Sequence, residues 1–195
     1  MNRKHVTVIL GHPDNDTWCR TLAETYAKGA ESAGARVRRI RLADLSFDPI
    51  LHKGYKTIQP LEPDLLKAQR DIAWANHLVF VYPMWWGSMP ALLKGFLDRV
   101  FHPGFGFQFD SDTSYTWKKL LCGRSARLII TMDGPPRLIR LLYKDPAVHM
   151  MKGMTLEFCG ISPVRVTEFG PVKRATRARR LLWKLEAEDL GRALK

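Results

Sequence analysis

Five short apolar segments alternate with segments of helical periodicity, and this alternation constrains the fold more than any other feature of the sequence. The expected strands are residues 5–10, 36–42, 77–82, 126–132 and 163–169. The expected helices are residues 18–33, 64–75, 90–101, 137–158 with a break near Pro146, and 173–194. Strands that alternate with helices form a parallel sheet covered by helices on both faces. The sequence therefore predicts one doubly wound α/β domain over residues 1–195, with a five-stranded parallel sheet of order 2-1-3-4-5.

Residues 90–101 give the clearest helical pattern in the chain. Ser88 is the expected N-cap, and Pro90 suits the first turn. Apolar residues recur at i, i+3, i+4 and i+7 spacing, which predicts a face turned to the core. These residues are Met89, Leu92, Leu93, Phe96, Leu97, Val100 and Phe101. The turn-rich segments 43–63 and 102–123 are expected to be long loops.

The hydropathy pattern and the cysteines indicate a cytoplasmic protein without a metal site. No apolar run approaches the roughly 18 residues of a membrane span, and the apolar run at the N-terminus is too short for a signal peptide. The three cysteines, Cys19, Cys122 and Cys159, are widely spaced and form no C-x-x-C pair. This spacing disfavours both a disulfide framework and a zinc site.

The chain carries 31 Lys and Arg against 19 Asp and Glu, a formal net charge of +12. Basic residues cluster in segments 36–41 and 173–184. Such a charge raises the question of nucleic-acid binding, but no zinc finger, helix-turn-helix or RNA-binding aromatic motif accompanies it. We therefore expect no nucleic-acid partner, and we interpret the second cluster as a solvated helix face. The charge also favours anionic ligands such as phosphorylated cofactors.

Three unusual loops follow the first, third and fourth expected strands: GHPDNDTW, PMWWGSMP and TMDGPP. The carboxyl ends of parallel strands lie at one edge of a sheet, so these loops should converge there. The first loop opens a helix, and the N–H groups of a helix start bind phosphate. Thr17 and His12 could add donors, or they could be a plain N-cap and a turn residue. Neither a P-loop nor a G-x-G-x-x-G pattern is present.

The adjacent residues Trp85 and Trp86 could form a flat apolar wall beside a flat conjugated ligand. Alternatively, one or both could pack in the core or in a dimer interface. Two consecutive side chains of an extended segment point to opposite sides, so the two rings cannot share one role.

The segment YPMWWGSMPALLKGFLDRVF resembles the signature of the NAD(P)H:quinone oxidoreductase family, which comprises flavodoxin-like reductases and includes ancillary subunits of potassium-efflux systems. The segments GHPDNDTW and LEFCGISPV are similar to the phosphate loop of that family and to its stretch before strand 5. The resemblance implies a flavodoxin-like fold that binds FMN, or alternatively FAD, and uses NADPH or NADH as reductant. It implies hydride transfer to a quinone or another flat aromatic acceptor by a ping-pong mechanism, in a homodimer.

The resemblance also implies roles for individual residues. The flavin phosphate would be held by His12, Thr17, Trp18 and Cys19. The isoalloxazine ring would be lined by Pro83, Met84, Trp85, Trp86, Gly87, Thr131, Asp133 and Gly134. The catalytic candidates are Trp86 and Gly134, through their backbone N–H groups, and Tyr143. The acceptor would meet Phe107, Phe109 and His149.

The chain departs from this family at several positions. Cys19 stands where asparagine is common, and Asp133 stands where glycine is common. A carboxylate at position 133 would oppose the negative charge of a reduced flavin unless it points away. Phe107 and Phe109 replace tyrosines of some members.

Two other functions fit the same fold. A flavodoxin-type electron carrier is disfavoured by the charge of +12, since such carriers are acidic. A regulatory ancillary subunit of a membrane ion-efflux protein would have residues 173–184 as a docking face.

Overall fold

The structure is a computed structural model that describes residues 4–57, 59–111, 113 and 115–194. Its strands are β1 (His5–Leu10), β2 (Arg36–Arg41), β3 (His77–Pro83), β4 (Phe107–Phe109), β5 (Trp117–Lys119), β6 (Ser125–Thr131) and β7 (Val164–Phe169). Its α-helices are α1 (Trp18–Ser32), α2 (Pro63–Trp74), α3 (Ala91–Val100), α4 (Pro136–Tyr143), α5 (Pro146–Met151) and α6 (Arg177–Ala193). A π-helical segment, Lys152–Glu157, continues α5, and short 3-10 turns lie at Leu42–Asp44 and Gly54–Lys56.

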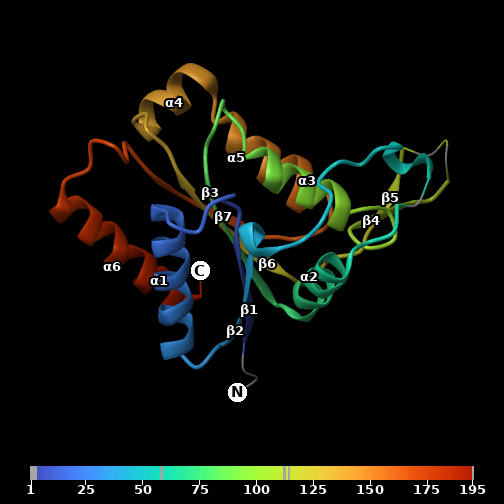
Figure 1. Cartoon of the computed structure of the whole chain (residues 1–195), viewed down its shortest axis with the longest axis horizontal. Coiled ribbons are helices and arrows are strands. Elements are labelled where there is room, and N and C mark those ends of the chain that lie inside the picture. The colour runs from blue at the N-terminus through green and yellow to red at the C-terminus, as the bar shows by residue number, and fades with distance from the viewer. Residues whose placement is uncertain (1–3, 58, 112, 114, 195) are drawn as a thin grey trace.

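The central sheet has five parallel strands in the order β2-β1-β3-β6-β7. This is the predicted order 2-1-3-4-5 once the two strands of a separate hairpin are left out of the numbering. Helices α1 and α6 cover one face, while α2, α3 and α5 cover the other (Figure 1). Val6, Val8 and Leu10 point from β1 into the α1–α6 side, whereas Ile9 points into the opposite core. Alternate residues of a fully buried strand thus serve two cores.

Several predicted boundaries were wrong. Segment 102–123 contains the antiparallel hairpin β4–β5, whose strands of three residues are too short to show a periodicity in the sequence. The break expected near Pro146 in the helical segment 137–158 is confirmed: α4 ends at Tyr143 and α5 begins at Pro146, with Lys144 and Asp145 between them at positive φ. Ser88 does not cap α3, because Pro90 occupies the N-cap position without a side-chain bond.

The last helix begins at Arg177, later than the expected residue 173, because Thr176 caps it and accepts a hydrogen bond from the Arg179 N–H. Among the described residues, no helix is both long enough and apolar enough to cross a membrane.

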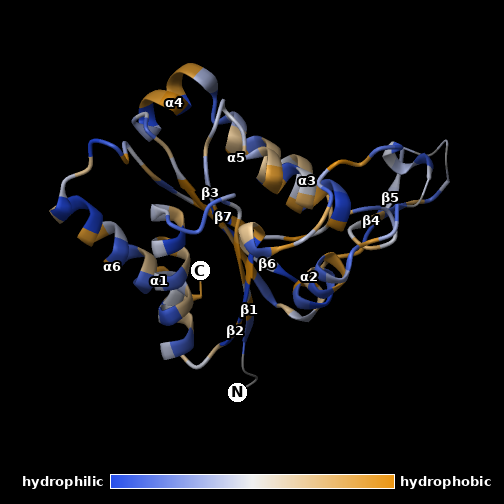
Figure 2. Ribbon diagram, viewed as in Figure 1, coloured by the Kyte–Doolittle hydropathy of each residue, from blue (hydrophilic) through white to orange (hydrophobic). Residues whose placement is uncertain are grey.

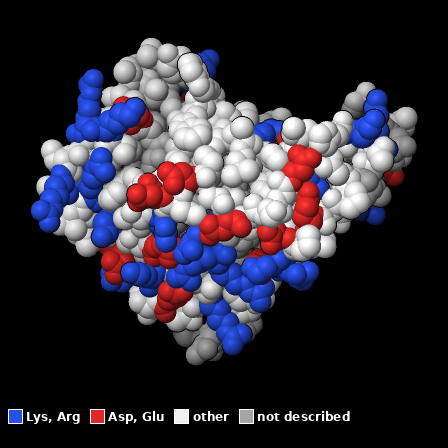
Figure 3. Space-filling view, in the orientation of Figure 1, with Lys and Arg blue, Asp and Glu red and all other residues white. Residues whose placement is uncertain are grey.

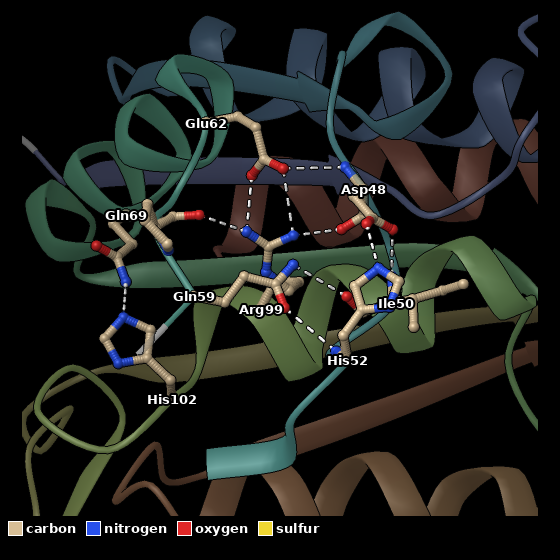
Figure 4. Close-up of polar contacts among 9 residues, drawn as sticks. Asp48, Ile50, His52, Gln59, Glu62, Gln69, Arg99 and His102 are labelled. Atoms are coloured by element: carbon tan, nitrogen blue, oxygen red, sulfur yellow. Dashed lines mark hydrogen bonds and ion pairs between the residues drawn. The ribbon is translucent and has the colours of Figure 1, made fainter. Parts of the chain in front are cut away.

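A buried arginine fastens the long loop after β2 to α3 (Figure 4). Arg99 is 1% exposed and donates hydrogen bonds to the Asp48 and Pro60 carbonyl oxygens. It also forms an ion pair of 2.9 Å with Glu62, whose carboxylate accepts a hydrogen bond from the Asp48 N–H. Since the guanidinium satisfies backbone groups of a segment without regular structure, it replaces the ladder bonds that a strand would provide there.

A buried histidine lies at the amino end of the sheet. His77 contacts the Tyr26 hydroxyl through Nε2 at 3.1 Å and the Ser125 hydroxyl through Nδ1 at 2.8 Å. Burial, reinforced by the positive charges of Arg127, Lys4 and Arg165, lowers the pKa of His77 to about 4. The folded protein therefore keeps this ring neutral at a pH where an unfolded chain would protonate it.

We expect His77 to cause a loss of stability between about pH 6.5 and pH 4. The unfolded state binds the proton in that window and the folded state does not, so the free energy of unfolding falls as the pH is lowered. The loss attributable to this group is up to about 3 kcal/mol. Urea unfolding across that range should show a shallower pH dependence for His77→Gln than for the wild type. His149→Gln, at an exposed histidine, is the matched control and should follow the wild type; equal slopes for all three proteins would contradict the assignment.

Candidate functional site

A cavity of about 230 Å³ lies at the carboxyl edge of the sheet, where the loops after β1, β3, β6 and β7 meet. The strand order reverses between β1 and β3, so this is the switch point at which doubly wound sheets bind ligands. The lining residues are His12, Thr17, Trp18, Cys19, Pro83, Met84, Trp85, Thr131, Met132, Asp133, Val172 and Lys173. The structure thus brings together all of the residues predicted to bind a cofactor except Trp86, Gly87 and Gly134.

One end of the cavity is built from hydrogen-bond donors. Thr17 caps α1 by accepting a hydrogen bond of 3.3 Å from the Arg20 N–H. The first N–H groups of a helix have no intrahelical acceptor, so those of Trp18 and Cys19 remain for a ligand. The indole Nε1 of Trp18 is buried and has no hydrogen-bond partner among the described residues. This donor set suits a phosphate group.

His12 adds a further donor at the same end. Its Nδ1 accepts a hydrogen bond of 2.9 Å from the Asp14 N–H, so the neutral ring carries its proton on Nε2. Burial lowers the pKa of His12, while the negative charge of the Asp14 carboxylate acts in the opposite direction. The ring also meets Trp85 edge to face, with centroids 5.4 Å apart.

The Cys19 thiol links the start of α1 to the end of β6. Its Sγ lies 3.2 Å from the Thr131 hydroxyl, and burial raises the pKa of the thiol to about 11. The group stays neutral near pH 7, so it adds no negative charge beside an anionic ligand. The thiol thus contributes a contact between the start of α1 and the end of β6, both of which line the cavity.

The two adjacent tryptophans have different surroundings. Trp85 and Ser88 exchange two backbone hydrogen bonds of 2.9 Å, which close a tight turn around Trp86 and Gly87. Both central residues have positive φ, 51° and 72°, as a type I′ turn requires. The Trp85 ring lines the cavity, whereas the Trp86 ring is fully exposed and lies outside it. The sequence predicted that the rings would differ, but not which one would face the cavity.

Asp133 has a cationic partner that the sequence reading missed. Its carboxylate forms an ion pair of 3.0 Å with Lys173 Nζ and accepts a hydrogen bond from the Lys173 N–H. The lysine thus offsets the negative charge that made Asp133 a poor neighbour for a reduced flavin. Val172 and Lys173 follow β7, the fifth strand of the sheet in chain order. Loops after parallel strands converge at the carboxyl edge, so the same rule would have predicted that these two residues lie at the cavity.

The remaining candidates lie outside this cavity. The Cβ position of Gly134 faces Ile139 of α4, and Tyr143 is exposed at the end of that helix. His149 is exposed on α5. Phe107 lines a second cavity of about 290 Å³ between α3 and the π-helical segment, and Phe109 is exposed on the hairpin.

Comparisons with known proteins agree with this architecture. The chain matches a family model described as a flavodoxin-like fold over residues 4–187. It is 31% identical over 188 residues to the ribosyldihydronicotinamide dehydrogenase [quinone] of Pongo abelii, an alignment that covers 82% of this chain and 78% of that protein. The alignments with the first curated relatives cover between 30% and 91% of the length of those relatives.

Two solved structures have the same fold. The NAD(P)H:quinone oxidoreductase of Methanothermobacter marburgensis superposes with a TM-score of 0.83 at 22% identity, over 98% of this chain and 97% of the other. An FMN-dependent NADH-azoreductase of Bacillus anthracis, solved in complex with FMN, gives a TM-score of 0.76 at 18% identity, over 100% and 99% of the two chains. With the family match and the quinone-reducing relative, these likenesses confirm the resemblance read from the sequence: the chain belongs to the flavodoxin-like family.

Proposed function

We propose that this protein is a flavin-dependent NAD(P)H:quinone oxidoreductase. The observation that carries the proposal is the cavity at the switch point, whose lining combines donors suited to a phosphate with the flat ring of Trp85. Relatives named as quinone dehydrogenases support the reaction class. When bound, the flavin would supply the two-electron chemistry, and the protein would bind and orient it.

The chain divides the binding task between its loops. The start of α1, with the Thr17 cap and the His12 Nε2–H, holds the phosphate. Residues 83–85 would form the wall for the flat ring, and Thr131 to Asp133 would meet its polar edge. Lys173 keeps the Asp133 carboxylate paired, so that the cavity does not repel a negatively charged ring. The Trp86 ring has no part in this site.

FMN is the cofactor we propose. The donors lie around one helix start, which suits a single phosphate, and one protein of the same fold was solved with FMN. A nicotinamide nucleotide would be the reductant and a quinone the acceptor, as the names of the relatives indicate.

The acceptor site would be completed by a second copy of the chain. Phe107 and Phe109 lie on the hairpin, away from the flavin cavity of their own chain, and Met154 is exposed beside the apolar cavity along α3. A homodimer through α3 and the π-helical segment would cover that cavity and bring the two phenylalanines toward the site of the partner.

We expect the purified protein to retain FMN after desalting, with a perturbed visible absorption band, and to oxidise NADPH or NADH when a quinone is added. Trp85→Ala should weaken FMN binding by about tenfold, since it removes the aromatic wall. Trp86→Ala is the matched control and should bind FMN as the wild type does.

The result that would contradict the proposal is a folded protein that retains neither FMN nor FAD. A protein that retains FMN but oxidises no reduced nucleotide with any quinone would instead be an electron carrier.

A further inference from the structure

Helix α4 carries an apolar face that no other described part of the chain covers. None of its residues is buried, and Leu141, Leu142 and Tyr143 are 77%, 61% and 64% exposed. Figure 2 shows the hydrophobic colour of this helix at the rim of the molecule. Exposed leucines gathered on one short helix, rather than scattered singly, indicate an interaction surface.

Arg140 and Ile139 hold α4 against the body of the protein, and Ile139 packs on the hydrophobic core. Arg140 forms ion pairs of 2.6 Å with Asp145 and with Glu168 on β7, so its face of the helix lies against the body of the protein. Successive residues of an α-helix are about 100° apart, which places Leu138, Leu141 and Leu142 roughly 100–160° away from Arg140. The three leucines therefore point outward.

The Trp86 turn extends this surface. The Cβ position of Gly87 lies 3.3 Å from Pro146, which comes three residues after the end of α4, so the turn is close to the end of the helix. Trp86 is fully exposed and has φ of 51°, an uncommon conformation for a bulky residue. A strained backbone that holds an aromatic ring in water suggests a function for that ring.

Basic side chains border the apolar face. Arg137, Lys144, Arg174 and Arg177 are exposed and have no ion-pair partner in the part of the chain that the structure describes. The end of β7 and the loop that follows it lie beside α4, since Glu168 pairs with Arg140 of α4 and Lys173 pairs with Asp133, three residues before that helix. Figure 3 shows Lys and Arg side chains gathered at the left, next to the top of the molecule, where most of the surface is uncharged.

We propose that α4 and the Trp86 turn dock on an anionic membrane surface. The leucines and Trp86 would enter the boundary between headgroups and acyl chains, and the basic side chains would lie against the lipid phosphates. Exposed Leu, Trp and Tyr bordered by Lys and Arg are the pattern of segments that lie in a membrane interface. A second copy of the chain fits this face poorly, because a two-fold interface would bring the unpaired basic side chains against each other.

This docking would place the flavin cavity at the bilayer surface, where lipophilic quinones dissolve. That consequence rests on the proposed function, whereas the docking itself does not.

The test is co-sedimentation of the full chain with vesicles of phosphatidylcholine alone and of phosphatidylcholine mixed equally with phosphatidylglycerol. We expect the mixed vesicles to bind at least about tenfold more protein, because basic side chains near an anionic surface add to the affinity. The double variant Leu141→Asp/Leu142→Asp should lose at least about tenfold of this binding. The matched control is Leu181→Asp/Leu182→Asp on α6, where two leucines are each 56% exposed; its binding should equal that of the wild type.

Two results would overturn the proposal. One is wild-type protein that does not sediment with mixed vesicles, or that sediments equally with both kinds. The other is a lower mass of the α4 variant in light scattering with vesicle binding unchanged, which would assign α4 to a contact between copies. FMN retention is measured on the same samples, so a protein that retains FMN but ignores vesicles contradicts only the membrane proposal.

Discussion

Thr17→Asp should lower the affinity of the protein for FMN by about 100-fold, a loss of about 2.7 kcal/mol in binding free energy. Aspartate is among the best N-cap residues, so α1 should keep its cap and the protein its free energy of unfolding. The new carboxylate would stand where the structure gathers donors around the start of α1, and it would repel a phosphate there. Fluorescence titration with FMN measures the affinity, and urea unfolding measures the stability.

Thr176→Asp is the matched control for this experiment. Thr176 caps α6 as Thr17 caps α1, with a hydrogen bond of 3.2 Å to the Arg179 N–H, but it does not line the cavity. Its variant should bind FMN with wild-type affinity. If both variants bound FMN equally well, the phosphate would have to lie elsewhere.

Arg99→Ala should lower the free energy of unfolding by about 3 kcal/mol. The substitution removes the guanidinium donors of two carbonyl oxygens, those of Asp48 and Pro60, and leaves the Glu62 carboxylate without its partner. The expected loss is at the lower end for a broken buried pair, because the Glu62 side chain is 29% exposed and water can reach it. Urea unfolding followed by circular dichroism measures the change.

Lys94→Ala provides the comparison on the same helix. Lys94 pairs with Asp98 at 2.7 Å on the surface of α3, and an exposed pair of this kind contributes only about 0.5 kcal/mol. Limited proteolysis gives a second readout, since cleavage between residues 48 and 60 should accelerate in Arg99→Ala alone. Similar losses of stability in the two variants would show that Arg99 does not fasten the loop.

The sheet was predictable because its strands are short, continuous apolar runs bounded by turn residues. Segments 5–10 and 77–82 have no helical periodicity and no charge that a buried strand would have to neutralise. The alternation with helices then selected a parallel sheet, and the carboxyl-edge rule placed His12, Trp85 and Thr131 around one cavity.

The unpredicted features depend on contacts that a linear pattern does not contain. The direction of the Trp86 ring follows from a left-handed turn, which the residue type itself disfavours. Arg99 stands next to apolar core positions of α3, and its partners come from a loop without periodicity more than thirty residues away. The pairing of Asp133 with Lys173 requires β6 and β7 to lie side by side.

The construction of α4 has a consequence for how such a protein can change over time. The helix has no fully buried side chain, it is held to the body of the protein by the Arg140–Glu168 ion pair and by the packing of Ile139, and two left-handed residues separate it from α5. Segments with little buried surface tolerate insertion, deletion and replacement. Residues 136–145 are therefore an exchangeable segment that begins three residues after the cavity residue Asp133: lineages can alter the surface beside the cavity by replacing this one segment, while the sheet and the donors at the start of α1 stay as they are.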